Sequence, residues 1–516
     1  MWPILLVILA DIIAKPLPQL FTSSMEERVV PKGWKDSNIA PILKPQKPCY
    51  KSSSYRGVAM TSHICKCMES ITKDTILTHL EKNFLLSKHQ HGGRPGRSTL
   101  TNLLCWLEEL GGRVDKGEPM DVLYCDFMKA YNVVSHAKLK AKLEKRFGIE
   151  GNLLLWISEW LRARRQRVVI SGQASEWTAV LSSIIQGSVL SGILFLMYID
   201  DIEDELEEPE ESVITRDEEV NEEQHAEEES EKPALISIFV DDTKTARTVS
   251  NMAEQQKMQG LINRLGDWSI KWDLRFNVDK CKIFHAGRTN PRFEYTLYGQ
   301  ILQSTEAEKD VGVILTPDLR PSKMVARAAS RANQMLGAWS RAVSWRDRNT
   351  WIKIYKTYIR PKLEYCSQAW SPWTSSDREA LEKVQRRAVG LVTTLPRNMK
   401  YEDKLKLLGL TSLVERRERG DMIQMFRSIQ GKDSVGYKPF FKLESEAQRE
   451  GPQTRARSGH LNVVPPAPVR TEQRRNFWSQ RSAPLWNALG DHVKMAENIN
   501  IFKNRYDEEL LMRRNS

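Results

Sequence analysis

An apolar, β-branched run that ends in two adjacent aspartates constrains the fold of this chain most. Residues 236–240 read Ile-Ser-Ile-Phe-Val, and Asp241 and Asp242 follow directly. Neighbouring side chains of a strand point to opposite faces, so two adjacent carboxylates lie together only where the chain turns. Such a turn can hold a divalent cation, or it can be the solvated tip of a hairpin. The dipeptide alone leaves both interpretations open.

A second apolar run carries another carboxylate. Residues 121–125 read Asp-Val-Leu-Tyr-Cys, Asp126 follows near the end of this predicted strand, and a helix is expected from Lys129. Two-metal phosphoryl transfer needs carboxylates from separate elements, because each of the two ions must be bound close to the other. The sequence therefore predicts a phosphoryl-transfer centre built from Asp126, Asp241 and Asp242, in a polymerase or in a nuclease.

The distribution of charge points to a polyanionic partner. The 516 residues include 77 Lys and Arg against 66 Asp and Glu, which gives a formal net charge of +11. Residues 203–232 hold sixteen acidic and two basic residues, so the rest of the chain carries +25. A surface this basic favours nucleic acid as the partner, the alternative being a merely soluble basic protein. The acidic stretch is expected to be a disordered, solvated insertion.

The cysteines and the N-terminus indicate an intracellular protein. The seven cysteines are scattered, and Cys65 and Cys67 lack the spacing of a zinc site, so we expect reduced thiols. The first ten residues are apolar, but no basic residue precedes them and Asp11 follows, which argues against a secretory signal. No stretch is long and apolar enough to span a membrane. We expect the protein in the nucleus or the cytoplasm, not secreted and without a membrane partner.

Three blocks of the sequence resemble, in order, the A, B and C motifs of reverse transcriptases. Residues 126–131 read Asp-Phe-Met-Lys-Ala-Tyr, residues 186–190 read Gln-Gly-Ser-Val-Leu, and residues 239–243 read Phe-Val-Asp-Asp-Thr. The closest similarity is to the enzymes of LINE-type, non-LTR retrotransposons of the jockey and chicken-repeat kind. Further blocks that resemble this family lie at residues 94–98, 277–282, 308–313, 360–365 and 381–387. The resemblance covers nearly the whole chain.

The resemblance implies an α/β (α+β) fold, a right-hand polymerase with fingers, palm and helical thumb followed by a helical C-terminal region. Apolar residues at helical spacing over 61–85 and from Thr99 to about Leu110 are typical of such a fold. The expected units are an N-terminal helical lead-in over 1–29, fingers and palm over 30–290, a thumb-like region over 291–400, and a C-terminal region over 401–516 with a linker at about 451–468.

The activity implied by the resemblance is RNA-directed DNA synthesis. A nucleotide would pass from a dNTP to the 3′-hydroxyl of a DNA primer on an RNA template. Asp126, Asp241 and Asp242 would hold two Mg²⁺ ions, with Mn²⁺ as the alternative, and Asp242 would be the least direct ligand. Tyr131 would lie under the sugar of the incoming nucleotide and select dNTP over rNTP.

The resemblance also implies roles for residues around this centre. Lys280 would protonate the leaving pyrophosphate, or it is a surface lysine beside a strand. The residues expected to bind the triphosphate are Lys44 and Arg56. The residues expected to line the template and nucleotide pocket are Gln186, Gly187 and Ser188. The residues expected to contact nucleic acid are Arg94 and Arg97 in a flexible basic loop, and Gly312 in a hairpin that grips the primer.

Several positions depart from the family's pattern. Asn132 replaces the usual aspartate, Ile185 the usual proline, and Gly93 an aromatic residue, while Ser191-Gly192 replaces Gly-Pro. The upstream endonuclease domain of such elements is missing from this sequence, which suggests a truncated or partly decayed copy. Two alternatives to an active polymerase are therefore considered: a folded nucleic-acid-binding relic, and a nuclease that uses the same carboxylates.

Overall fold

The computed structural model describes residues 3–45, 47–180, 182–206, 233–396, 398–447 and 461–515. The predicted acidic insertion lies outside the described residues from residue 207 to residue 232, and the predicted linker lies outside them as far as residue 460.

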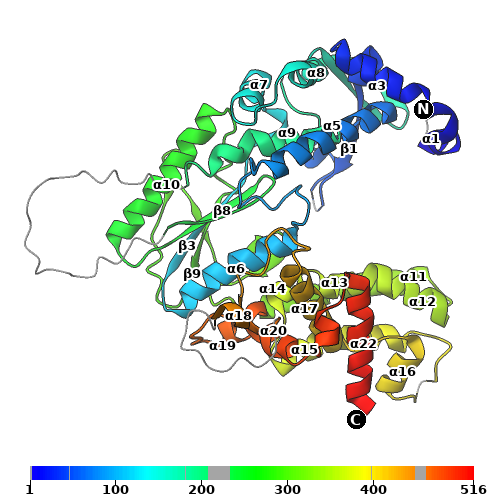
Figure 1. The fold of residues 1–516 in the computed structure, drawn as a ribbon, viewed down its shortest axis with the longest axis vertical. Helices are drawn as coiled ribbons and strands as arrows, with labels where there is room; N and C mark the ends of the chain where they lie inside the picture. The colour runs from blue at the N-terminus through cyan, green and yellow to red at the C-terminus, as the bar shows by residue number, and fades with distance from the viewer. Residues whose placement is uncertain are drawn as a thin grey trace, which may run out of the picture.

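The centre of the molecule is a five-stranded sheet in the order β12-β9-β3-β8-β7. Its strands are β3 (Met120–Cys125), β7 (Leu235–Phe239), β8 (Asp242–Thr248), β9 (Lys282–Ala286) and β12 (Gln303–Thr305). All neighbouring strands are antiparallel except β12 and β9. Helices cover both faces of the sheet (Figure 1), which explains why β3 is apolar nearly throughout instead of alternating.

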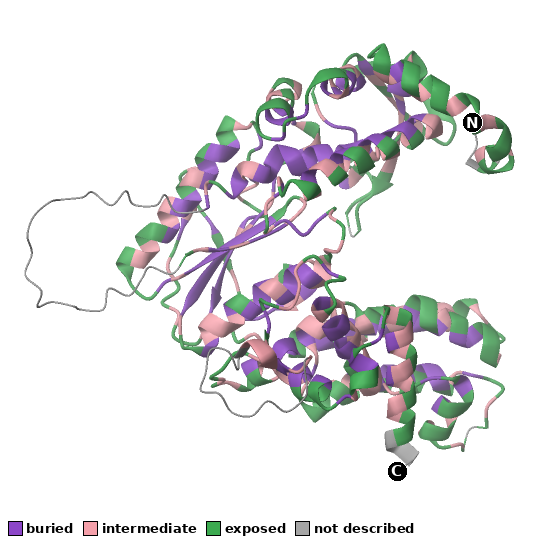
Figure 2. Cartoon of the chain, viewed as in Figure 1, coloured by how far each residue is buried: buried purple, intermediate pink, exposed green. Residues whose placement is uncertain are grey.

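The two faces of this sheet belong to two different cores. One face presents Val122, Ala246 and Phe284 to a core shared with α6 (Thr99–Asp115) and α11 (Ser322–Ala342). The other face presents residues such as Leu123, Ile238 and Ile283 to a core shared with α9 (Leu190–Ile199) and α10 (Met252–Lys271). Strands β3, β7, β8 and β9 are correspondingly buried along most of their length (Figure 2). The sheet therefore joins the two halves of the molecule.

The upper arm in Figure 1 is built on a second sheet and on helix α5 (His63–Lys82). In this sheet β1 (Asp36–Leu43) pairs antiparallel with β2 (Tyr55–Met60) and parallel with β4 (Arg164–Ile170). Helix α5 begins after Ser62, whose side chain accepts from the backbone N–H of Cys65. The helix predicted over 61–85 is therefore present.

The lower arm is helical. Its larger helices are α11, α12 (Arg348–Ile354), α15 (Ser375–Gly390), α17 (Leu413–Ile429), α20 (Trp478–Asn487) and α22 (Ile499–Asn515). A third core, which includes Phe426, Trp486 and Phe502, joins α17, α20 and α22. The boundary predicted at residue 290 falls within the central sheet unit, because β12 extends that sheet to Thr305. None of the helices in the described parts of the chain combines the length and apolar character that a bilayer span requires.

Candidate active site

Strand register brings the three predicted aspartates to one end of the central sheet. Cys125 of β3 faces Thr243 of β8, so the next residues outward, Asp126 and Asp242, lie beside each other. Asp242 pairs with Phe239 across the β7–β8 hairpin, which leaves Val240 and Asp241 as its two-residue turn. A cavity of about 160 Å³ opens beside Asp126 and Asp242.

The turn that carries Asp241 is strained and externally clamped. Val240 adopts φ +58°, a left-handed conformation that a β-branched residue rarely takes and that costs on the order of 1–3 kcal/mol. Gln90 holds it in place, because its Oε1 accepts from the backbone N–H groups of Val240 at 2.9 Å and of Gly92 at 2.8 Å. A Cβ on Gly92 would lie 2.4 Å from Val240 Cγ2, so only glycine fits there.

Negative charge is concentrated at this end of the sheet. Burial, followed by the charges of Asp241, Asp310 and Asp126, raises the pKa of Asp242 to about 6. Burial and the charge of Asp126 also raise the pKa of Asp241, against the opposing effect of Arg56 and Lys280. Carboxylate oxygens on separate elements are the donors that a hard divalent cation prefers, so this donor set fits such an ion.

Lys280 is paired with one of these carboxylates. Its Nζ lies 2.9 and 3.2 Å from the two carboxylate oxygens of Asp126, and its side chain is 59% exposed. The surrounding loop is docked on the same residue, since the backbone N–H of Asn277 donates to the Asp126 carbonyl at 2.7 Å. Among the described residues no three acidic, histidine or cysteine side chains already converge on one point. In this structure the charge of Asp126 is therefore balanced by Lys280.

Tyr131 forms a rigid wall near the aspartates. It lies in a short 3-10 helix (Ala130–Asn132), and its ring stacks on Phe195 of α9 with the centroids 4.7 Å apart. Burial and the charge of Asp241 raise the pKa of Tyr131 to about 12, so the hydroxyl stays protonated. The ring is held by its packing on Phe195, on the side of the site where Asp241 lies.

The turn formed by Gln186, Gly187 and Ser188 is fixed from two sides. On one side the backbone N–H of Ala59 donates to the Gln186 carbonyl at 2.8 Å. Gly187 has φ +117°, and a Cβ there would lie 2.7 Å from the Ala59 carbonyl oxygen. On the other side Ser188 Oγ donates to the buried carboxylate of Glu69 at 2.8 Å. The turn precedes α9 instead of belonging to it.

Lys44 and Arg56 lie on the β1–β2 hairpin of the upper arm. Arg56 is exposed, and its charge is near enough to lower the pKa of Asp241. Lys44 is also exposed, but its Nζ donates to the carbonyl of Ser53 at 3.0 Å. The structure therefore associates Arg56 with the aspartates and leaves Lys44 at the hairpin.

Arg94 and Arg97 bind carboxylate and carbonyl groups of the protein itself. Arg94 makes a two-pronged ion pair with Glu81, with both distances 2.7 Å, and donates to the carbonyl of Ser87 at 2.6 Å. Arg97 donates to the carbonyls of Lys88 and Gln90. Both guanidinium groups thus hold the loop that contains Gln90, and their contact with nucleic acid stays a prediction.

Gly312 occupies a tight hairpin next to the aspartates. The hairpin pairs β13 (Glu308–Asp310) with β14 (Val313–Leu315), and its turn residues Val311 and Gly312 have φ +41° and +97°. Two positive φ values define a type I′ turn, in which glycine is favoured. Asp310 and Val311 line the same cavity as Asp126 and Asp242, so this hairpin forms the wall opposite the aspartates.

Residues 42–337 match the model of the family described as reverse transcriptase (RNA-dependent DNA polymerase). The chain belongs to the reverse transcriptase family. Members of this family depend on divalent metal ions. The predicted fold class, an α/β right-hand polymerase, is confirmed, as is the resemblance to LINE-type enzymes.

Two relatives from Drosophila melanogaster illustrate the similarity. The chain is 23% identical to the RNA-directed DNA polymerase from mobile element jockey over 392 residues, and the aligned region covers 75% of this chain and 41% of the relative. It is 24% identical to the probable RNA-directed DNA polymerase from transposon X-element over 385 residues, and the aligned region covers 72% of this chain and 39% of the relative. The chain thus spans about two fifths of the length of these relatives.

The structure is also similar to solved telomerases. Apo telomerase from Candida tropicalis, truncated from its C-terminal domain, gives a TM-score of 0.35 at 13% identity, covering 59% of this chain and 60% of that one. Telomerase from Candida albicans gives a TM-score of 0.38 at 11% identity, covering 76% of this chain and 68% of that one.

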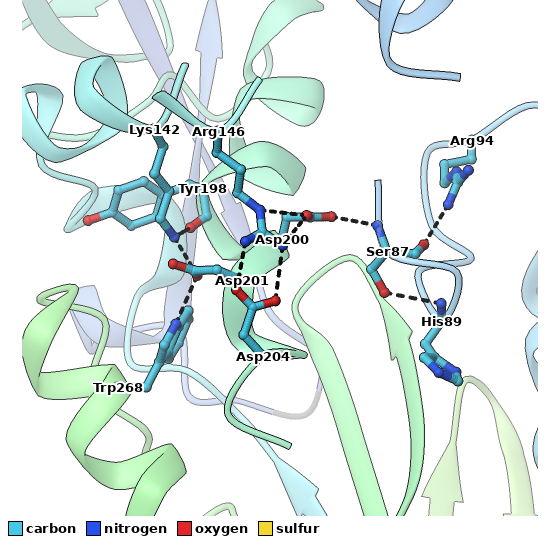
Figure 3. A network of polar contacts seen from close by, with 10 residues as sticks. All are labelled: Ser87, His89, Arg94, Lys142, Arg146, Tyr198, Asp200, Asp201, Asp204 and Trp268. Carbon is cyan, nitrogen blue, oxygen red and sulfur yellow. Dashed lines mark hydrogen bonds and ion pairs between the residues drawn. The ribbon is translucent and has the colours of Figure 1, made fainter. Parts of the chain in front are cut away.

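A second pair of adjacent aspartates, Asp200 and Asp201, is bound by cationic and N–H groups within the protein (Figure 3). Asp201 accepts from Lys142 Nζ at 2.5 Å and from Trp268 Nε1 at 2.9 Å. Asp200 accepts from the backbone N–H of Ser87 at 2.8 Å and from Arg146 Nε at 3.2 Å. These aspartates join the end of α9 to α7 (His136–Lys145), to α10 and to the loop before Arg94.

Proposed function

We propose that this chain is an RNA-directed DNA polymerase that extends a DNA primer on an RNA template with dNTPs. The observation that carries the proposal is the register of β3 and β8, which brings Asp126 next to the turn with Asp241 and Asp242. Tyr131 and the β13–β14 hairpin lie around this centre, where a template, a primer end and a nucleotide would meet.

The residues present suit two-metal nucleotidyl transfer. Asp126, Asp241 and Asp242 would hold two Mg²⁺ ions, or Mn²⁺, and bound ions would stabilise the charge that develops on the attacking and leaving oxygens. The 3′-oxygen of the primer forms a bond to the α-phosphorus of the dNTP, and the bond from that phosphorus to the β-phosphate oxygen breaks. The proton of the 3′-hydroxyl leaves to solvent.

Three side chains would complete this reaction. Lys280 would give its proton to the departing pyrophosphate. Arg56 contributes positive charge beside the triphosphate. The fixed ring of Tyr131 leaves no room for a 2′-hydroxyl, so dNTP is preferred over rNTP.

Primer extension tests the proposal. The full chain is incubated with an RNA template, an annealed DNA primer, dNTPs and Mg²⁺, and incorporation is compared with that of an Asp241→Ala, Asp242→Ala variant. We expect extension by the wild type only, with both proteins showing the same thermal unfolding. A folded wild type that incorporates no more than the variant would refute polymerase activity.

A second candidate is a nucleic-acid-binding relic without polymerase activity, which Asn132 and Ile185 favour. Gel-shift binding of the primer–template without incorporation identifies it. A nuclease would instead cut the substrate in the absence of dNTP. The same reaction mixtures therefore separate all three activities.

A further inference from the structure

A buried ion pair lies directly behind the metal-binding turn. Lys244 of β8 donates from Nζ to Asp310 Oδ2 at 2.5 Å and to Asn102 Oδ1 at 3.0 Å. The side chains of Lys244 and Asp310 are only 5% and 3% exposed. Asp310 comes from the β13–β14 hairpin and Asn102 from α6, so three separate elements meet at this ammonium group.

Lys244 is also the nearest lysine along the strand to Asp242. Side chains two residues apart on a strand point to the same face, so Lys244 and Asp242 share one side of the sheet. The charge of Asp310 raises the pKa of Asp242, while the charge of Lys244 lowers it. The Lys244 ammonium is thus within electrostatic reach of Asp242 but bonded to a different carboxylate.

The orientation of Lys244 is imposed by its partners. Asn102 donates from Nδ2 to Ser237 Oγ at 2.8 Å and to the carbonyl of Ile238 at 3.2 Å, which fixes its Oδ1 toward Lys244. The ammonium also lies 5.0 Å from the centroid of the Trp106 ring. A buried ammonium group without a carboxylate partner is strongly unfavourable, so pairing with another nearby carboxylate is favoured.

We propose that Asp310 is a positioning residue that holds the Lys244 ammonium away from Asp242, and thereby keeps Asp242 free to bind a divalent metal ion. The inference rests on the proposed function only in assigning Asp242 to metal binding. Without Asp310 the ammonium turns to Asp242 and competes with the metal. Docking of the β13–β14 hairpin and metal affinity are therefore coupled.

Direct metal binding tests this inference without any turnover. The full chain is titrated with Mn²⁺ alone, in the absence of nucleic acid and dNTP, and free Mn²⁺ is followed by electron paramagnetic resonance. We expect Asp310→Asn, which keeps the shape and one acceptor, to weaken Mn²⁺ binding about tenfold. Lys244→Met should bind Mn²⁺ as the wild type does, and Lys244→Met combined with Asp310→Asn should regain that affinity.

The double variant separates a positioning role from a structural one. If Asp310 only stabilises the hairpin, the double variant binds Mn²⁺ at least as weakly as Asp310→Asn, and that result overturns the inference. Unchanged binding by folded Asp310→Asn overturns it as well. If Asp310→Asn does not fold, Asn102→Ala replaces it, since it removes one of the two acceptors of Lys244. Binding about threefold weaker supports the inference, and unchanged binding overturns it.

The proposed function can fail separately from this inference. A chain that binds Mn²⁺ with the expected pattern but extends no primer supports the role of Asp310 and refutes polymerase activity. An Asp241→Ala, Asp242→Ala variant sets the level of Mn²⁺ binding outside this site. A wild type that does not exceed that level overturns the inference.

Discussion

Two pairs of adjacent aspartates end apolar runs in this chain, and their surroundings differ. Asp200 and Asp201 follow the buried helix α9 and are bonded to Arg146, Lys142, Trp268 and a backbone N–H. Asp241 and Asp242 follow a buried strand, and no ion pair joins them to any residue in the described parts of the chain. The first pair is neutralised by partners within the protein, whereas burial and neighbouring carboxylates raise the pKa of both members of the second pair.

The difference shows that the role of an aspartate pair depends on the groups that surround it, and not on the dipeptide itself. Charged groups with complete partners fix three elements of the fold together. Carboxylates that repel each other at a strained turn oppose folding, and they are retained where an external cation can bind. The following variants test this contrast, from the largest expected effect to the smallest.

Asp241→Asn should abolish activity without destabilising the protein. Loss of a ligand for the ions lowers nucleotide incorporation by about a thousandfold, as expected for a group that acts on the transition state. Mutual repulsion of the carboxylates is relieved, so the free energy of unfolding should stay equal or rise. Primer extension and urea unfolding measure the two effects. A clear loss of stability would contradict the contrast between the pairs.

Asp201→Ala should have the opposite signature. It leaves the Lys142 ammonium buried without its carboxylate, which lowers the free energy of unfolding by about 3 kcal/mol. The folded fraction should incorporate nucleotides at the wild-type rate. Urea unfolding checks the first expectation, with Lys142→Met combined with Asp201→Leu as the control that should recover much of the stability. A neutral Asp201→Ala would show that the network does not stabilise the fold.

Gly92→Ala should disturb the functional pair through its clamp. The added Cβ would lie 2.4 Å from Val240 Cγ2 and 2.6 Å from Val240 N, so the turn must shift. We expect a stability loss of about 1–3 kcal/mol, typical of overpacking, and a lower incorporation rate. Gly111→Ala in α6 is the matched control, because its Cβ meets nothing within 4 Å and should be neutral or stabilising. Equal behaviour of the two variants would rule out the clamp.

Acid should weaken the same clamp. Burial, followed by the positive charges of Arg97, Lys244, His89 and Arg94, lowers the pKa of His91 from 6.5 to about 3. As the pH falls, His91 is therefore protonated in the unfolded chain before it is protonated in the folded protein. The stability that neutral His91 allows is present above about pH 6.5 and is lost progressively toward pH 3. Between pH 6.5 and pH 5 the loss amounts to about 2 kcal/mol.

The pH dependence can be assigned to His91 by substitution. The substitution His91→Gln places a side-chain amide near Thr101. The free energy of unfolding of this variant, measured in urea, should fall less steeply over this pH range than that of the wild type. His91 contacts Thr101 at 3.0 Å, so the amide can replace that contact. Identical slopes for the two proteins would assign the acid sensitivity elsewhere.

The sequence was sufficient to predict features that depend on local pattern. Apolar runs located β3 and the β7–β8 hairpin, and antiparallel pairing then brings their terminal aspartates together. Helical spacing located α5 and α6, although α6 continues to Asp115 beyond the predicted end. These features arise from interactions among neighbours in the chain, which composition and spacing record directly.

Features that depend on distant contacts were missed. Gln90 holds a turn 150 residues away, and Glu69 holds Ser188 from 119 residues away. A single glutamine or glutamate in a helical or loop segment carries no sign of such a partner. The internal contacts of Arg94 and Arg97 were missed as well, because a guanidinium group suits an internal carboxylate or carbonyl as well as a phosphate. The adjacent glycines at residues 92 and 93 were the available sign of close packing.

The division of the central sheet between two cores has a consequence for its motions. Amide hydrogens exchange with solvent when the structure around them opens. Strands β3 and β9 contribute side chains to both cores, so the opening of either arm alone leaves them protected by the other. Hydrogen exchange should therefore be slowest in these two strands. The backbone beside Asp126, at the end of β3, should therefore keep its register when either arm opens alone.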